Sequence, residues 1–367
     1  MNHMNMIAIE DCCEILDSMR VPVTAADREK GQYPYYGANG IQDYIAGYIF
    51  DDELVLLAED GGNFGSKDRP IAYRVSGKCW VNNHAHVLKP KEGLNVDYLC
   101  YALMFYKVDG MINGATRQKL TQTSMKKMQI PLRSMKEQVQ IVDRLNRIIK
   151  IKEQRLQELQ LLEKIVKARF VEMFENREYN VVRLGDVCTK ITDGMHKTPN
   201  YLDDGITFIS AKNIVNGELD FSNVKYISED EYMEIQKRCQ TEKYDILLSK
   251  SGSLGTPVIV KTEEKIGLFE SLAVIKYDRT KLIPEFLCEQ LKTEKIQRQF
   301  KIGTKGVAIK HLHLGVIADI RVIVPDLEKQ KEFADFVRVV DKSKVEVQKA
   351  LDKTQMLFDS LMQQYFG

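Results

Sequence analysis

Two long segments of this chain place apolar residues at a seven-residue spacing. Between residues 136 and 174 there is no proline or glycine, and the apolar residues recur as they do along the seam of a coiled coil. A shift of 192 positions finds the same spacing between residues 328 and 366. We therefore predict two long helices that pair through one seam. The predicted seam residues are Leu145, Lys152, Leu159, Val166, Val337, Lys344, Leu351 and Phe358.

A lysine occupies the same seam position in both segments, at Lys152 and Lys344. One interpretation is that the aliphatic part of each lysine packs in the seam while its amine reaches water. The other is that a polar seam residue fixes the register and orientation of the helix pair. We favour the first interpretation.

The predicted length of each helix sets a distance scale. About 39 residues with a rise of roughly 1.5 Å each give a helix of about 58 Å. Two such helices in one chain most simply pair with each other, and antiparallel pairing places the segments that precede them at opposite ends. That length corresponds to about 17 base pairs of B-DNA. The sequence therefore predicts a molecular ruler.

The chain consists of two repeated halves. The same shift of 192 positions aligns residues 114–138, GATRQKLTQTSMKKMQIPLRSMKEQ, with residues 306–330, GVAIKHLHLGVIADIRVIVPDLEKQ. Towards the start of each half the offset falls to 191 and then to 175. The front portions have therefore diverged in length, and we place the extra residues of the second half within residues 215–239.

The front portion of each half is predicted to be mixed α/β. Short apolar runs bounded by Gly, Asp, Asn and Ser indicate strands, and they lie at residues 45–50, 54–58, 206–209, 246–248, 258–260 and 273–275. Amphipathic helices are predicted around residues 98–106 and 284–298. The predicted fold is thus α+β, with two repeated domains and two antiparallel helices related by a pseudo-two-fold axis. The domains are residues 1–135 and 181–327, and the helices are residues 136–176 and 328–367.

Composition indicates globular domains and offers no obvious ligand. The chain has 367 residues, of which 44% are hydrophobic and 29% charged, and its formal net charge is +1. A DNA partner would therefore have to be held by local basic patches. The seven cysteines show no C-x-x-C spacing, which favours reduced, semi-buried thiols over a disulfide framework or a zinc site. The chain shows no signal-peptide pattern and no run of membrane-spanning length, so we expect a cytoplasmic protein.

Catalytic and metal-binding motifs were not found. The glycines between Gly61 and Lys67 have the wrong spacing for a phosphate loop, and an Asn or Asp before two prolines and an aromatic residue, as in adenine methylases, does not occur. His84 and His86 could share a strand face and bind a metal, but the repeat aligns them with Leu272 and Val274, which favours a partly buried structural role. We expect His311 and His313 to lie on a polar, phosphate-facing surface.

Polar, glycine-containing loops recur at matching places in both halves. They carry the Asn, Gln, Arg, Lys, Ser and Thr side chains that recognise base edges, together with aromatic residues. Any one of these residues could simply lie in a solvated loop, but their recurrence favours DNA binding. The candidate DNA contacts in the first half are Tyr35, Tyr36, Asn39, Asn63, Lys67, Arg69, Asn83, Arg117 and Lys119. Those in the second half are His196, Lys197, Lys212, Asn213, Lys250, Ser251, Ser253, Lys305 and Lys310.

These features together resemble the specificity subunit of type I restriction-modification systems. The resemblance extends over essentially the whole chain. It depends on the duplicated order of variable region, apolar run ending in a Glu-Gln or Lys-Gln dipeptide, and long helix, seen in QIPLRSMKEQVQIVDRL and VIVPDLEKQKEFADFV. Further pieces are YPYYGANGIQDYI, LVLLAEDGGNFG and CWVNNHAHVL in the first half, and FISAKNI and DILLSKSGSLG in the second.

The resemblance implies a non-catalytic subunit that recognises a bipartite DNA site. Each recognition domain would bind one half of the site in double-stranded DNA, and the helices would bind two modification (methyltransferase) subunits. Two restriction subunits would be further partners, and no membrane is expected. S-adenosylmethionine, ATP and Mg are expected on the modification and restriction subunits, with no cofactor or metal in this chain. The alternatives are a coiled-coil scaffold that joins two protein-binding modules, or a stand-alone DNA-modifying enzyme, which the missing motifs disfavour.

Overall fold

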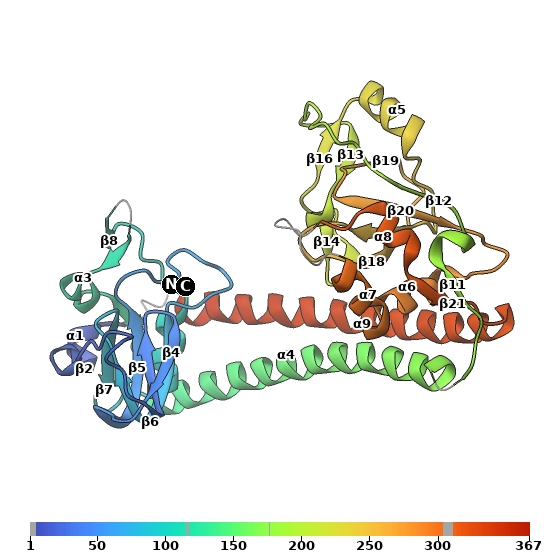
Figure 1. The fold of residues 1–367 in the computed structure, drawn as a ribbon. Helices are drawn as coiled ribbons and strands as arrows, with labels where there is room; N and C mark the ends of the chain where they lie inside the picture. The colour runs from blue at the N-terminus through green and yellow to red at the C-terminus, as the bar shows by residue number, and fades with distance from the viewer. Residues whose placement is uncertain (1–4, 115–116, 176, 304–310) are drawn as a thin grey trace. The chain divides into compact units, whose positions relative to one another are not determined.

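The computed structural model describes residues 5–114, 117–175, 177–303 and 311–367. Its chain divides into two compact units, unit 1 with Met1–Leu156 and Lys349–Gly367, and unit 2 with Gln157–Gln348. Each unit contains β-sheet, short helices and one part of each long helix (Figure 1). This mixed α and β content, with the long helices, confirms the predicted fold class.

The two long helices are antiparallel to each other. Helix α4 spans Met135–Phe170 and continues into a π-helical turn at Val171–Glu175, and α9 spans Leu327–Phe366. Within unit 1, the beginning of α4 contacts the end of α9, where Arg144 Nη1 donates to Tyr365 Oη at 3.1 Å. Within unit 2, the end of α4 contacts the beginning of α9, where Arg169 pairs with Glu332 at 2.7 Å. Because the contacts run in opposite directions along the two helices, the pairing is antiparallel.

Lys152 has a specific partner across the helix pair in unit 1. Its Nζ donates to Oε1 of Gln355, and it lies 5.3 Å from the ring centroid of Phe358. The first interpretation, in which the amine only reaches water, is therefore incomplete for this lysine. Lys344 makes its ion pair with Asp341 of its own helix, at 3.7 Å. The two lysines thus differ in their contacts although their seam positions match.

Unit 1 is built around a six-stranded sheet. Its strand order is β2-β7-β5-β6-β3-β4. The strands of the unit are β1 Met6–Ala8, β2 Cys13–Ile15, β3 Lys30–Gly37, β4 Gly40–Ile45, β5 Phe50–Ala58, β6 Ala72–Val81, β7 Ala85–Pro90, β8 Ile112–Asn113, β9 Lys119–Leu120 and β10 Gln129–Pro131. The short helices are α1 Ile9–Cys12, a 3₁₀ turn at Asp17–Met19, α2 Val96–Met104 and α3 Gln122–Lys126.

The central strand β5 is buried on both faces. Val55 and Leu57 pack in the core that includes α2 and the long helices, while Leu54 and Leu56 pack in a second cluster on the other face. Because successive side chains of a strand point to opposite faces, a strand covered on both sides is continuously apolar. The run at residues 54–58 was therefore correctly predicted as a strand.

Unit 2 contains a four-stranded sheet of order β12-β20-β17-β18 and a three-stranded sheet of order β16-β13-β19. Its strands are β11 Val181–Arg183, β12 Cys188–Asp193, β13 Ile206–Ile209, β14 Ile214–Val215, β15 Glu218–Leu219, β16 Lys225–Ile227, β17 Ile246–Ser249, β18 Pro257–Ile259, β19 Ile266–Leu268, β20 Leu272–Tyr277 and β21 Arg321–Ile323. Its short helices are 3₁₀ turns at Leu184–Val187 and Ala211–Asn213, then α5 Glu229–Arg238, α6 Pro284–Lys292, α7 Glu294–Gly303 and α8 Leu314–Asp319. The segment predicted to hold extra residues, 215–239, contains β15, β16 and α5.

Two predicted elements differ from the structure. Residues 45–50 do not form a strand, because β4 ends at Ile45 and a turn with Gly47 leads to β5 at Phe50. The helix predicted at 284–298 is interrupted at Thr293, whose extended backbone (φ −62°, ψ 148°) caps α6 before α7 begins. Periodicity alone did not show these breaks.

Each unit packs one aromatic residue of a short helix against the end of the long helix from the other half. In unit 1, the ring centroids of Tyr98 in α2 and Phe366 in α9 are 5.1 Å apart. In unit 2, those of Phe286 in α6 and Phe174 after α4 are 4.9 Å apart. The contacts are equivalent in the two halves, so the internal repeat extends to side-chain packing.

All seven cysteines are free thiols, and all except the half-buried Cys188 are buried, which is deeper than the semi-buried positions expected from the sequence. Among the described residues, no helix combines the length and the apolar character that a membrane crossing requires.

Candidate nucleic-acid interface

The polar loops of unit 1 meet around Asp60, which follows β5. Asp60 Oδ1 lies 2.7 Å from His84 Nδ1 and 3.0 Å from Arg117 Nη2. The next residue, Gly61, accepts a hydrogen bond from Asn39 Nδ2 at 2.9 Å. Its backbone amide donates to the carbonyl of Gln118 at 3.2 Å. The loops that carry Asn39, Asp60, His84 and Arg117 therefore form one surface, although they are far apart in sequence.

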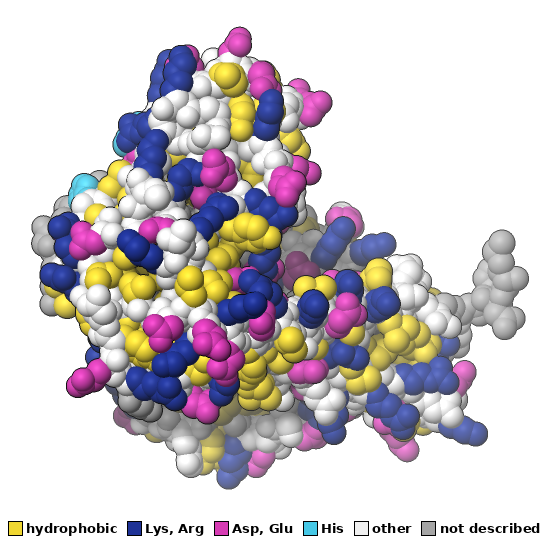
Figure 2. All heavy atoms as spheres, turned by 90° about the vertical axis from the view of Figure 1, so that its right-hand side faces the viewer, with side chains coloured by type: hydrophobic (Ala, Val, Ile, Leu, Met, Phe, Trp, Pro, Cys, Tyr) yellow, Lys and Arg dark blue, Asp and Glu magenta, His cyan; other side chains and the backbone are white. Residues whose placement is uncertain are grey.

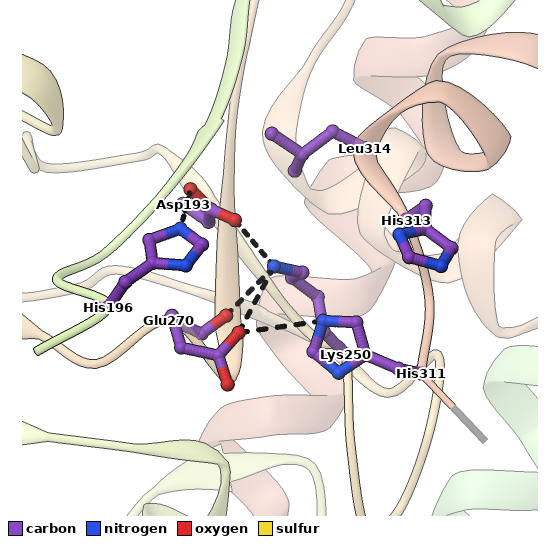
Figure 3. A pocket seen from close by; sticks show the side chains of 7 residues that line it. All are labelled: Asp193, His196, Lys250, Glu270, His311, His313 and Leu314. Atoms are coloured by element: carbon purple, nitrogen blue, oxygen red, sulfur yellow. Dashed lines mark hydrogen bonds and ion pairs between the residues drawn. The ribbon is translucent and has the colours of Figure 1, made fainter. Parts of the chain in front are cut away.

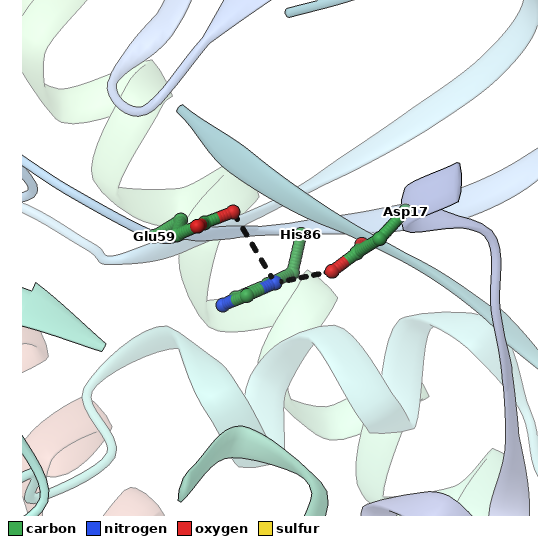
Figure 4. Close-up of side chains that lie close together, drawn as sticks. All are labelled: Asp17, Glu59 and His86. Carbon is green, nitrogen blue, oxygen red and sulfur yellow. Dashed lines mark hydrogen bonds and ion pairs between the residues drawn. The ribbon is translucent and has the colours of Figure 1, made fainter. Parts of the chain in front are cut away.

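A network of buried charged side chains, Asp17, Glu59 and His86, lies beneath this surface (Figure 4). His86 Nδ1 lies 2.7 Å from Asp17 Oδ2 and 3.7 Å from Glu59 Oε2. Arg20 pairs with Glu59 at 2.6 Å, and Lys119 pairs with the other oxygen of Glu59 at 2.9 Å. The network thus connects Glu59, which follows β5, with His86 in β7 and Lys119 in β9.

The carboxylates of this network are stabilised in their ionised form. Burial alone raises the pKa of Asp17, but the hydrogen bond and charge of His86 lower it below the usual value. Burial likewise raises the pKa of Glu59, and hydrogen bonds from Arg20 and Lys119 lower it overall. The side chains that stabilise these two carboxylates are Arg20, His86 and Lys119 of unit 1.

Asp17, Glu59 and His86 also satisfy a simple distance criterion for metal binding, because their ligand atoms lie within 4.8 Å of one another. However, both ring nitrogens of His86 face oxygen acceptors, since Nε2 lies 2.9 Å from the carbonyl oxygen of Leu120. Two acceptors require two N–H donors, so the geometry fits an imidazolium. A metal would have to displace this proton and the cations on Glu59, so the residues fit an ion-pair network better than a metal site.

The polar loops of unit 2 meet at an open pocket of about 580 Å³ (Figure 3). Asp193 and His196 come from the end of β12 and the loop after it, Lys250 follows β17, and Glu270 lies between β19 and β20. His311, His313 and Leu314 complete the lining. The loops that carry His196, Lys250 and His311 therefore converge, whereas the 3₁₀ turn with the candidates Lys212 and Asn213 does not line the pocket.

Lys250 and Asp193 form a buried ion pair at the base of the pocket. Lys250 Nζ also donates to the backbone carbonyl of Glu270 at 3.0 Å. Asp193 further contacts His196 at 3.2 Å and pairs with Arg238. Burial alone raises the pKa of Asp193, but the hydrogen bonds from Lys250 and His196 and the charges of Lys250 and Arg238 lower it overall.

Glu59 and Lys250 occupy the same backbone position in the two halves. The amide of Leu120 donates to the carbonyl of Glu59 at 2.7 Å, and the amide of Leu312 donates to that of Lys250 at 2.9 Å. Both residues are buried beside an aspartate, Asp17 in unit 1 and Asp193 in unit 2. The repeat therefore keeps a charge network at this point while reversing the sign of one member.

Strand pairing corrects the predicted alignment of the histidines. Ala58 pairs with Ala85 in unit 1, and Ser249 pairs with Leu272 in unit 2. Because Ala58 matches Ser249, His84 matches Ser271 and His86 matches Ala273. The alignment with Leu272 and Val274 was therefore wrong by one residue. His86 does have a buried structural role, as predicted.

Most of the predicted DNA contacts lie at the surface of their units. Exposed side chains belong to Asn39, Lys67, Arg69, Asn83, Arg117, Lys119, His196, Lys197, Lys212 and Ser253. Half-buried side chains belong to Tyr36, Asn63, Asn213 and Ser251. Lys305 and Lys310 lie outside the described residues. Exposure permits a DNA contact without demonstrating one, so these positions stay predictions.

Two of the candidates are buried and were wrong as direct contacts. Tyr35 is 1% exposed, because strand alternation in β3 points its ring into unit 1, where its hydroxyl accepts a hydrogen bond from the Val23 amide at 3.0 Å. Lys250 is equally inaccessible, because its ammonium is held by Asp193 and Glu270.

The side chain of Asn213 is already used within unit 2. Its Oδ1 accepts a hydrogen bond from the Ser210 amide at 3.0 Å, and its Nδ2 donates to the carbonyls of Asp220 and Asn223 at 3.3 and 3.1 Å. Both polar groups of the Asn213 side chain thus stabilise a 3₁₀ turn, and a contact of Asn213 with DNA stays a prediction.

Sequence reasoning missed the acidic residues that organise both surfaces. Asp17, Asp60, Asp193 and Glu270 were not among the candidates, since a search for DNA contacts favours basic and amide side chains. The signal that could have found them is position: each lies at the end of a strand, where the polar loops of its unit begin.

A duplicated chain with one polar-loop surface in each half and a pair of antiparallel long helices defines the class of protein. The chain belongs to the family of the type I restriction modification DNA specificity domain, whose family model matches residues 1–161 and 176–354. The two matched regions correspond to the two halves of the repeat and confirm the resemblance seen in the sequence.

Named relatives agree with this assignment. A type I restriction enzyme specificity subunit of Haemophilus influenzae is 28% identical over 353 residues, which cover 91% of this chain and 86% of the relative. The MjaVIII specificity subunit of Methanocaldococcus jannaschii is 20% identical over 394 residues, covering 96% and 91% of the two chains.

Solved structures show the same fold. The S subunit of a type I restriction-modification system from M. genitalium matches with a TM-score of 0.58 and 16% identity, over 100% of this chain and 97% of that chain. A chain from a structure concerned with complex assembly and conformational transition of the type I R-M system matches with a TM-score of 0.56 and 14% identity, over 99% and 97%.

Proposed function

We propose that this chain is the subunit that selects the DNA sequence in a type I restriction-modification complex, each half recognising one part of a bipartite site. The observation that carries the proposal is the convergence of separate polar loops into one surface in each unit, around Asp60 in unit 1 and around the pocket of Glu270 in unit 2. Membership of the specificity family supports it. Specificity subunits are generally non-catalytic. In this proposal, methylation and cleavage of DNA are carried out by partner subunits.

The partners would be modification subunits bound along the long helices. Both helices carry apolar side chains that solvent reaches, and in this proposal the modification subunits cover some of them. These are Val139, Ile151, Leu156, Leu161 and Ile165 on α4, and Val339, Val345, Met356 and Leu357 on α9. In this proposal S-adenosylmethionine, ATP and Mg belong to the partners.

The near-neutral charge of the chain fits a subunit that does not bind DNA alone. On the face drawn in Figure 2, Lys and Arg side chains alternate with Asp and Glu, in agreement with the net charge of +1. Since phosphate contacts provide most non-specific affinity, partner subunits would contribute much of the phosphate binding.

The experiment is to co-express the chain with the modification subunit encoded beside it and to map the DNA it methylates. We expect a stable complex that methylates a split site. Replacing residues 1–135 by the corresponding domain of another specificity subunit should change one half of the site and leave the other half unchanged. A chain that binds protein partners but confers no sequence preference would instead be a scaffold and would contradict the proposal.

A further inference from the structure

Glu270 projects into the place where the polar loops of unit 2 meet (Figure 3). It lies in the turn between β19 and β20, and its amide donates to the carbonyl of Met195 at 2.9 Å. Its side chain is 25% exposed. The backbone is thus fixed while the carboxylate borders an open pocket of about 580 Å³.

The carboxylate is oriented by neighbouring cations but is not saturated by them. Its Oε2 lies 3.5 Å from Lys250 Nζ and 3.5 Å from His311 Nε2. Charge-assisted hydrogen bonds are usually about 2.7–2.9 Å long, and Lys250 makes its shorter contact with Asp193. Among the described residues, none donates a hydrogen bond to Oε1. The group therefore retains accepting capacity that faces the pocket.

The internal repeat independently places Glu270 among the candidate DNA contacts. The amide of Lys250 donates to the carbonyl of Ser271 at 2.8 Å, as the amide of Glu59 donates to that of His84 at 2.9 Å. The residue before each acceptor is Glu270 in unit 2 and Asn83 in unit 1. Asn83 is exposed and was predicted from sequence to contact DNA.

The chemistry of a carboxylate restricts what it can recognise. An ionised carboxylate only accepts hydrogen bonds, and it is repelled by phosphates. In the major groove the available donors are the exocyclic amines, N4 of cytosine and N6 of adenine. We propose that Glu270 accepts a hydrogen bond from such an amine, and so selects cytosine or adenine at one position of the half-site bound by unit 2. This inference rests on the proposed function and names a specificity-determining residue for it.

The test compares the complete complex containing the wild-type chain, Glu270→Gln or Glu270→Ala. Selection from randomised duplexes first defines the preferred site of each complex. At every cytosine or adenine of the unit 2 half-site, the base is then replaced by an analogue without the exocyclic amine, 2-pyrimidinone or purine, and Kd is measured. For the wild-type complex we expect one position at which the analogue weakens binding about 5- to 150-fold.

The variants separate recognition from damage to the duplex or the fold. At that position the analogue should change the Kd of the Glu270→Ala complex less than about 2-fold, because the missing amine no longer has a partner. Glu270→Gln, which adds a donor to the retained acceptor, should relax the base preference there. The preference in the half-site bound by unit 1 should not change.

The matched control is Glu263→Gln, which removes a charge of the same sign from the same unit. Glu263 has a side chain that is 79% exposed and pairs with Lys243 at 2.8 Å, and its variant should keep every base preference. An unchanged preference in Glu270→Ala, with or without a lower Tm, would overturn the inference and leave Glu270 a partner of Lys250. A wild-type complex that selects no sequence would instead refute the proposed function.

Discussion

Gln138 forms the same three side-chain hydrogen bonds in the first half of the chain as Gln330 forms in the second. Oε1 of Gln138 accepts from the amide of Asn95 at 2.8 Å. Its Nε2 donates to the carbonyls of Gly93 and Arg133, both at 2.9 Å. The side chain is 0% exposed, so one residue in the first turns of α4 connects this helix to the segment before α2.

Gln330 repeats this arrangement at the beginning of α9. Its Oε1 accepts from the amide of Ile283 at 2.9 Å, and its Nε2 donates to the carbonyls of Lys281 and Pro325, both at 2.8 Å. It is also 0% exposed. The glutamine shared by the two halves of the sequence is therefore a structural residue that attaches each long helix to its module.

Replacing either glutamine by leucine should destabilise its unit. Gln138→Leu removes three hydrogen bonds made by a fully buried side chain, and each such bond contributes about 0.5–1.5 kcal/mol. We therefore expect a loss of about 2 kcal/mol in the free energy of unfolding measured with urea. Gln154→Leu, at an exposed position of the same helix, should change it by less than about 0.5 kcal/mol. Equal effects of the two substitutions would contradict this role.

Tyr244 has a backbone conformation that is unfavourable for its side chain. Its φ is 73°, in the left-handed region where residues with a Cβ are strained by roughly 1–2 kcal/mol. Tyr244→Gly should therefore raise the free energy of unfolding by about 1 kcal/mol, observed as a higher Tm. Asn216→Gly is the comparison, because Asn216 has a φ of 52° but asparagine tolerates this region better. A lower Tm for Tyr244→Gly would show that the ring contributes more than the strain costs.

The buried pair of Asp193 and Lys250 should make the stability of unit 2 depend on pH. The pKa of Asp193 is lower in the folded state than its ordinary value of 3.8. Its contribution is thus present above that value and is lost as the pH falls through the folded-state pKa. Asp193→Asn should lower the free energy of unfolding by about 3 kcal/mol at pH 7, and this difference should shrink at acidic pH. The measurement is urea unfolding from pH 7 to pH 3.

Asp203→Asn provides the control for that series. Asp203 is an exposed carboxylate of the same unit, so its substitution should change the free energy of unfolding little at any pH. A difference between wild type and Asp193→Asn that stays constant down to pH 3 would mean that the ion pair does not provide the stability.

The structure explains which parts of the site could be predicted from sequence. The long helices that carry Gln138 and Gln330 align without gaps, because a coiled-coil seam does not tolerate a change of length. The front portions contain insertions, so the equivalence of Asn83 and Glu270 became visible only from strand pairing. Sequence similarity also could not reveal the position shared by Glu59 and Lys250, since burial there requires a balanced charge network and not a particular sign.

Lys67 allows a test of the predicted basic contacts. It is exposed in the loop of residues 59–69. If it neutralises one phosphate, Lys67→Ala should reduce the slope of log K against log salt concentration by about 0.9 and weaken binding to all sequences equally. The measurement is the Kd of the complex for specific and non-specific duplexes over a range of salt concentrations. Lys237→Ala on α5, where Lys237 pairs with Glu234 of the same helix, should leave the slope unchanged.

The long helices should determine the spacing between the two halves of the DNA site. One heptad added to both α4 and α9, after Leu156 and before Lys349, keeps the seam in register because the helices are antiparallel. Seven residues lengthen a helix by about 10 Å, the rise of about three base pairs. The methylated site should therefore gain about three base pairs of spacer while both half-sites keep their sequence, because the loops around Asp60 and Glu270 are untouched. Sequencing of methylated DNA would show this directly, and an altered half-site or an unaltered spacer would mean that the helices do not set the distance.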